Sequence, residues 1–142
     1  MEKIEQIIFY SLEKSIKTYR QFAQKNISKL DIKITLDQWL ILKSLEETPG
    51  ISQQQIAVKF FKDYASVTRI IEILVKKKYL SRKLHSNDRR RFDLGITKLG
   101  LGILSDLKPI IHSNRAMALN NISKKEIETL QNILTKITKN CV

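Results

Sequence analysis

Three short motifs indicate where helices begin in this chain. Each has a serine or threonine followed three residues later by glutamine or glutamate, and the motifs occupy residues 35–38, 52–55 and 123–126. In such a capping box, the hydroxyl and the longer side chain satisfy backbone N–H groups that the first helical turn leaves unpaired. Each motif also has an apolar residue on either side, which fixes the direction in which the chain enters the helix. We therefore expect helices that begin near residues 36, 53 and 124.

A further helix is expected directly after the second motif. Asp63 can cap it, and apolar side chains then recur at helical spacing. These side chains are Val67, Ile70, Ile71, Leu74 and Val75. The segments 53–60 and 64–77 would form two helices joined by about three residues, which is typical of a helix-turn-helix. An ordinary helical hairpin within a bundle has the same spacing.

The hydrophobic period changes after residue 79. Apolar residues now alternate with polar ones, around Leu80 and Leu84 and again from Phe92 to Ile96, which predicts two short strands. The segment 85–91 between them contains the turn formers Asn and Asp and three consecutive arginines. We therefore expect a β-hairpin with a basic tip.

The remaining segments favour helices. Thr97 can cap a helix whose apolar side chains extend to residue 111, and Pro109 is expected to kink or break it. Residues 124–139 have one apolar side, and residues 3–30 form an amphipathic pattern with extra aromatic residues off its main stripe. A first helix that is apolar on more than one side suits packing against a second subunit, although further contacts within one chain explain it equally well. The fold class is mostly α with a small β-hairpin, which is a winged helix-turn-helix.

The charge is concentrated in the winged segment. The chain of 142 residues carries a net charge of +12, and residues 59–91 hold eleven lysines and arginines against three acids. A lysine-rich composition without a function would be spread more evenly along the chain. The concentration indicates a polyanionic partner, and its place in the sequence favours double-stranded DNA.

The winged helix suggests which side chains contact DNA. The major groove, about 12 Å wide, admits one helix, and the first turns of that helix reach the base edges. Here we expect them to present Tyr64, Ala65, Ser66, Thr68 and Arg69. An arginine at such a place can contact guanine through two hydrogen bonds.

The basic tip has a separate predicted role. Arg89, Arg90 and Arg91 are placed to enter the minor groove, and Asp88 could orient one of their guanidinium groups. A solvated charged turn is the alternative explanation. The residues expected to contact the phosphates are Ser52, Gln53, Lys76 and Arg82.

The sequence resembles the MarR family of bacterial transcription regulators over essentially its whole length. The resemblance is carried by SVTRIIEIL at 66–74, YLSR at 79–82, and Asp88-Arg89-Arg90 followed by Leu94, Ile96-Thr97 and Gly100. It implies an obligate homodimer that binds a pseudo-palindromic operator. Dimerisation would use residues 1–33 and 98–142, and the DNA-binding lobe would span 34–97. Arg90 would enter the minor groove, and a small lipophilic effector would often release a repressor of this kind.

Two positions depart from the family pattern. Lys78 stands where the family usually has glycine, so the helix before it is expected to end differently. Gly95 is unusual within the second strand and is expected to weaken that strand or to mark a bulge. Both departures concern the resting orientation of the wing.

Other functions find little in the sequence. There is one cysteine, Cys141 near the end, no metal-spaced cluster, and no motif typical of an enzyme active site, so we expect no metal, no cofactor and no catalysis. No secretion signal or membrane-spanning stretch is recognised, which favours the cytoplasm.

Tyr19, Phe22, Trp39 and His112 are candidates to line an effector cavity, although aromatic residues at helical spacing are usually core. The alternative to DNA binding is a winged-helix interaction module with an acidic partner.

Overall fold

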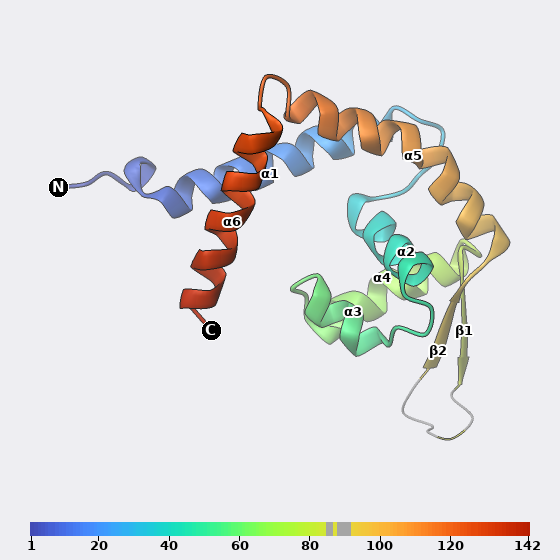
Figure 1. The fold of residues 1–142 in the computed structure, drawn as a ribbon. Helices are drawn as coiled ribbons and strands as arrows, with labels where there is room; N and C mark the ends of the chain where they lie inside the picture. The colour runs from blue at the N-terminus through green and yellow to red at the C-terminus, as the bar shows by residue number, and fades with distance from the viewer. Residues whose placement is uncertain (85–86, 88–91) are drawn as a thin grey trace.

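The computed structural model describes residues 1–84, 87 and 92–142, and within them the chain is mostly helical with one β-hairpin. The predicted fold class is thereby confirmed (Figure 1). The elements in chain order are the short 3-10 helix η1 (Ile4–Gln6), α1 (Ile8–Ser28), α2 (Leu36–Glu47), α3 (Gln53–Lys59), α4 (Tyr64–Lys76), β1 (Leu80–Leu84), β2 (Phe92–Ile96), α5 (Lys98–Ala118) and α6 (Lys124–Asn140).

All three capping boxes form as expected. The hydroxyl oxygens of Thr35, Ser52 and Ser123 each accept a hydrogen bond of 3.1 Å from the backbone N–H three residues later. The partner side chains accept from the cap backbone in return, so α2, α3 and α6 begin at the predicted places. Asp63 caps α4 by accepting from the backbone N–H of Ser66 at 2.7 Å. These starts follow from local chemistry alone.

The core forms between α2, α4, α5 and the hairpin. Val67, Ile71 and Leu74 are fully buried on one side of α4, and they belong to a cluster that includes Leu42 of α2 and Leu107 of α5. Burial of this side fixes the orientation of α4, because the opposite side must then face outward. The helix-turn-helix predicted from spacing is therefore present, with the turn at residues 60–63.

The two strands pair without interruption. β1 and β2 are antiparallel, with Leu80 opposite Ile96, Ser81 opposite Gly95 and Leu84 opposite Phe92. The bulge considered at Gly95 is absent from this ladder. A Cβ atom at Gly95 would lie 3.0 Å from the hydroxyl oxygen of Ser81, so the glycine makes room for the side chain across the pair.

The end of α4 differs from expectation at Lys78. This lysine adopts the left-handed conformation, with φ of 65°, that a glycine would take after a helix. Its carbonyl oxygen accepts a hydrogen bond of 2.6 Å from the hydroxyl of Thr97, which joins the end of α4 to the start of α5. The helix therefore ends in the way that a glycine would end it, and the altered ending was a wrong prediction.

Pro109 does not break α5, contrary to one of the two outcomes expected of it. The helix continues from Lys98 to Ala118 with the proline inside. Pro109 and Ser105, whose carbonyl loses its donor, both lie on the exposed side, where water can replace the missing hydrogen bond. The buried residues Leu104, Leu107 and Ile111 anchor the helix on both sides of the proline.

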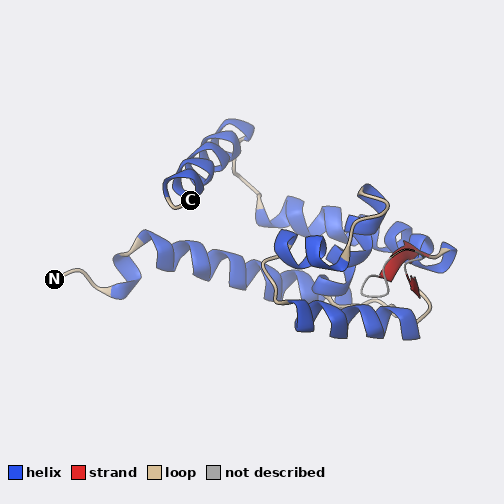
Figure 2. Ribbon diagram, turned by 90° about the horizontal axis from the view of Figure 1, so that it is seen from below, coloured by secondary structure: helices blue, strands red, loops and turns tan. Residues whose placement is uncertain are grey.

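The N-terminal helix is also shorter than predicted. Ile7 is extended, so the expected helix over 3–30 is divided into η1 and α1. The N-terminal half of α1 and all of α6 extend away from the core (Figures 1 and 2). Their apolar side chains are exposed: Ile8, Phe9 and Ile16 on α1 and Leu130, Ile133 and Leu134 on α6. None of the residues of α6 is buried.

Phe61, in the turn before α4, allows a direct test of backbone strain. Its φ is 58°, and its side chain is 96% exposed. The left-handed conformation costs a residue with a Cβ atom about 1 kcal/mol, whereas the exposed ring has little burial to lose. Phe61→Gly is therefore expected to raise the free energy of unfolding by about 1 kcal/mol in urea denaturation. Phe61→Ala keeps the Cβ atom and is the control; equal effects of both variants would contradict the explanation.

Candidate nucleic-acid interface

The outward side of α4 presents the side chains predicted to read DNA. Tyr64, Ala65, Arg69 and Glu72 are exposed there. They are exposed because the opposite side of the helix is buried in the core. Arg69 projects from the second turn of α4, within reach of the charge on Asp63.

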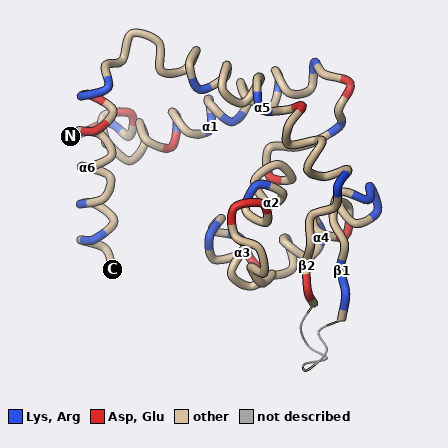
Figure 3. Tube along the Cα trace, turned by 45° about the vertical axis from the view of Figure 1, so that its right-hand side comes forward, with Lys and Arg blue, Asp and Glu red and all other residues tan. Residues whose placement is uncertain are grey.

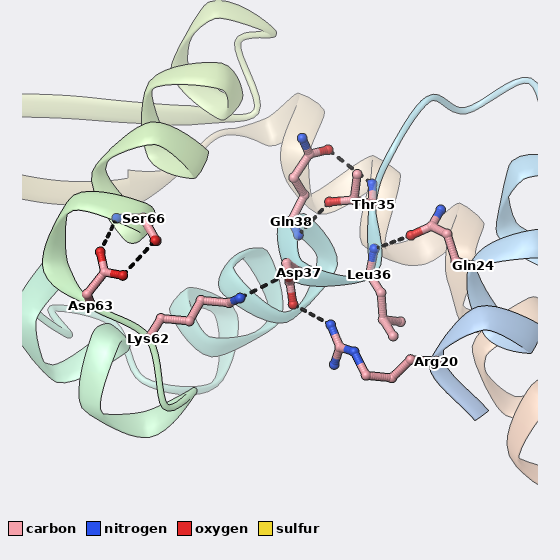
Figure 4. A network of polar contacts seen from close by, with 9 residues as sticks. All are labelled: Arg20, Gln24, Thr35, Leu36, Asp37, Gln38, Lys62, Asp63 and Ser66. Atoms are coloured by element: carbon pink, nitrogen blue, oxygen red, sulfur yellow. Dashed lines mark hydrogen bonds and ion pairs between the residues drawn. The ribbon is translucent and has the colours of Figure 1, made fainter. Parts of the chain in front are cut away.

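Ser66 and Thr68 lie on the same helix, but their hydroxyl groups are already engaged. The Ser66 hydroxyl donates to the Asp63 carboxylate at 2.9 Å (Figure 4), and the Thr68 hydroxyl donates to the Tyr64 carbonyl at 2.9 Å. The hydrogen bonds from Ser66, the backbone N–H first, hold the pKa of Asp63 below its ordinary value. Each hydroxyl has its proton committed at the start of α4, so the Ser66 oxygen would meet a partner as an acceptor, while the Thr68 oxygen already accepts from Gln53.

Gln53 is placed differently from its predicted role. Its side chain is buried, and its amide donates to the hydroxyl of Thr68. This contact ties the first turn of α3 to α4, so the side chain does not face outward toward a phosphate. Ser52 stands beside it as the cap of α3. No pattern along the chain indicates the pairing of these two residues, which lie 15 positions apart.

A basic groove connects α4 to the first wing strand. Arg69 and Lys76 of α4 and Arg82 of β1 supply its positive charge, and Glu72, Ile73 and Val75 complete its lining. The guanidinium of Arg82 lies 4.9 Å from the centre of the Phe92 ring, a cation–π contact that holds it against β2. Figure 3 shows the positive charge carried by β1. The structure therefore brings together three of the predicted DNA contacts from two elements.

The predicted wing residues cannot be placed in the same way. Asp88, Arg89, Arg90 and Arg91 lie outside the described residues. The strands on either side are described, and their pairing extends as far as Leu84 and Phe92. The minor-groove role of this segment remains a prediction from the sequence.

The four candidate effector residues do not share one cavity. Trp39 and His112 line a pocket between α2 and α5, whereas Tyr19 and Phe22 line another between α1 and the end of α5. The structure therefore divides the four candidates between two pockets, and a role in effector binding stays a prediction for each of them. The sequence reasoning also missed Arg115, whose guanidinium lies 5.9 Å from the Trp39 ring centre. Its spacing from His112 along α5 was the available signal.

Other kinds of site find no support in the part of the chain that is described. No three His, Cys, Asp or Glu side chains lie close enough together there to hold a metal ion. Of the helices described, none is long and apolar enough to cross a membrane. Cys141 is exposed and free.

Comparisons with known proteins agree with this geometry. Residues 34–92, which include the helix-turn-helix and β1, match the model of the MarR family. Bordetella bronchiseptica BpsR, described in terms of the regulation of its DNA binding by 6-hydroxynicotinic acid, shares 20% identity over 97% of both chains with a TM-score of 0.86.

Two further solved structures contain DNA. S. aureus MepR in complex with DNA has a TM-score of 0.84 at 23% identity, covering 94% of this chain and 98% of its own. A mutant of MarR from E. coli in complex with operator DNA has a TM-score of 0.85 at 21% identity, covering 96% of this chain and 99% of its own. At these identities the likeness establishes a shared fold over nearly the whole chain.

Proposed function

We propose that the chain is a winged-helix DNA-binding regulator of the MarR family, and that it is a homodimeric, ligand-responsive repressor that acts in the cytoplasm on a pseudo-palindromic operator. The observation that carries the proposal is the exposed side of α4, which continues into the basic groove of Arg69, Lys76 and Arg82. A single face thus offers one side chain for base edges and two for phosphates.

The roles of these side chains follow from the chemistry of the two grooves. Arg69 would contact guanine in the major groove, where its two parallel N–H groups match two acceptors. Lys76 and Arg82 would neutralise phosphates and hold the register of the protein on the duplex. Ser52 would approach a phosphate at the start of α3, and Arg90 would enter the minor groove.

The exposed apolar surfaces of α1 and α6 support a homodimer. A lone chain would leave Ile8, Phe9 and Ile16 of α1 in water together with the apolar side of α6. Surfaces of this kind usually mark an interface between proteins. We assign dimerisation to residues 1–33 and 98–142 and DNA binding to residues 34–97.

A ligand response is supported by the pocket between α2 and α5. It lies where the two assigned regions meet, and its lining combines Trp39 with His112 and Arg115. A small molecule with an apolar ring would pack against Trp39 there. Such a ligand would alter DNA affinity only if it bound more tightly to one orientation of the two regions than to the other.

The decisive experiment is a selection of bound DNA from a random library, followed by measurement of affinity on the enriched sequence. We expect two half-sites with centres about 10 base pairs apart and an affinity that falls steeply with salt. Light scattering is expected to give the mass of a dimer. Enrichment of no sequence, together with a monomer that binds an acidic protein, would replace the proposal with the interaction module.

A further inference from the structure

Asp37, in the first turn of α2, connects three elements of the fold. One carboxylate oxygen accepts a hydrogen bond of 2.5 Å from Nη2 of Arg20 on α1. The other lies 3.0 Å from Nζ of Lys62, in the turn between α3 and α4 (Figure 4). The carboxylate therefore lies between a helix assigned to dimerisation and the turn that precedes the recognition helix.

α1 contacts this end of α2 a second time. Gln24, one helical turn after Arg20, accepts a hydrogen bond of 2.8 Å from the backbone N–H of Leu36. Its amide donates at 3.2 Å to the carbonyl of Ile34. Two neighbouring side chains of α1 thus fix the first residues of α2, so Asp37 has a defined position relative to α1.

The ion pairs of Asp37 are partly shielded from water. The side chains of Arg20, Asp37 and Lys62 are 40%, 29% and 27% exposed. Partial burial raises the pKa of Asp37, but the hydrogen bonds and charges of Lys62 and Arg20 outweigh it and hold the pKa below its ordinary value. The stabilisation is therefore present at neutral pH and is lost only as the pH falls below about 4 through that lowered pKa.

Lys62 links these contacts to the start of α4 through its position in the chain. It precedes Asp63, the residue that caps α4, and its backbone N–H donates to the carbonyl of Ala57 at 2.9 Å. Polar contacts of Arg20, Asp37 and Lys62 therefore join α1 to the residue that directly precedes the cap of the recognition helix. If α1 belongs to the dimer interface, the position of this N-terminus decides how far apart the two recognition helices lie.

We propose that Asp37 is a positioning residue that fixes the recognition helix relative to α1, and so sets the half-site spacing that the dimer accepts. The proposal rests on the proposed function. It assigns no contact with DNA to Asp37. The ion pairs of Asp37 with Arg20 and with Lys62 would instead fix the geometry of the dimer.

The test uses Asp37→Asn in the full-length chain. If Asp37 acted only through its charge, its removal would strengthen binding to the phosphates. The variant would then bind every duplex at least as tightly as the wild type. Positioning predicts the opposite sign on the operator, a loss of roughly tenfold, with no loss on random-sequence DNA. Asp31→Asn makes the same change of charge in the loop before α2, outside these contacts, and is the matched control.

Operators whose half-site spacing is changed by one base pair measure the spacing preference of the protein. A variant that only destabilises the fold would leave this preference unchanged. The wild type is expected to discriminate between spacings, and Asp37→Asn to discriminate less. Arg20→Gln is expected to have the same effect in the wild type and no further effect in the Asp37→Asn background. Unchanged spacing preference in all three variants would overturn the inference. Failure of the wild type to bind any operator would instead overturn the proposed function.

Discussion

Replacement of Gly100 by alanine is expected to lower the free energy of unfolding by about 3 kcal/mol. Gly100 is buried in the first turn of α5, where a Cβ atom would lie 2.3 Å from the carbonyl oxygen of Tyr79 and 2.9 Å from Cγ1 of Ile96. The carbonyl has little freedom to withdraw, because it accepts a hydrogen bond of 3.1 Å from the backbone N–H of Thr97. Urea denaturation followed by circular dichroism measures the loss.

Gly102 provides the matched control on the same helix. A Cβ atom there would meet nothing within 4 Å. Alanine at this position should raise the free energy of unfolding by about 1 kcal/mol, since glycine inside a helix loses more backbone entropy on folding. The two substitutions are identical in chemistry and opposite in expected sign. Destabilisation of both variants to the same degree would contradict the close approach of α5 to Tyr79.

The helix starts could be predicted because each depends on a few consecutive residues. Thr35, Ser52, Asp63 and Ser123 all accept from a backbone N–H three residues later, and no distant contact is needed. The break at Ile7 could not be predicted in this way, because the apolar pattern continues across it. Pro109 removes a backbone donor, as the sequence predicts, yet the buried side chains on both sides of it keep α5 continuous.

In the candidate site, too, the features set by local pattern could be predicted, and those set by tertiary packing could not. The outward side of α4 could be predicted from helical periodicity, since burial of Val67, Ile71 and Leu74 determines what faces outward. The inward position of Gln53 depends on how α3 packs against α4, which a pattern along the chain does not contain. The contacts of Asp37 likewise join residues 17 and 25 positions apart. Side-chain pairing of this kind follows from tertiary packing.

Removal of Arg69 is expected to have the largest effect on operator binding among the described residues. A contact to guanine through two hydrogen bonds contributes about 1–3 kcal/mol of discrimination, so Arg69→Ala would weaken operator affinity by about 5- to 150-fold. Affinity for random-sequence DNA would fall much less, because only one phosphate-seeking charge is lost.

The contrast between base recognition and charge decides the role of Arg69. Lys29→Ala removes the same charge from an exposed position directly after α1, outside α4 and both strands, and should leave operator affinity nearly unchanged. Fluorescence anisotropy at several salt concentrations measures both variants on operator and random duplexes. An equal loss for Arg69→Ala on the two duplexes would show that Arg69 contributes charge alone. In that case α4 would have to read its sequence through other side chains, with Tyr64 the next exposed candidate in its first turn.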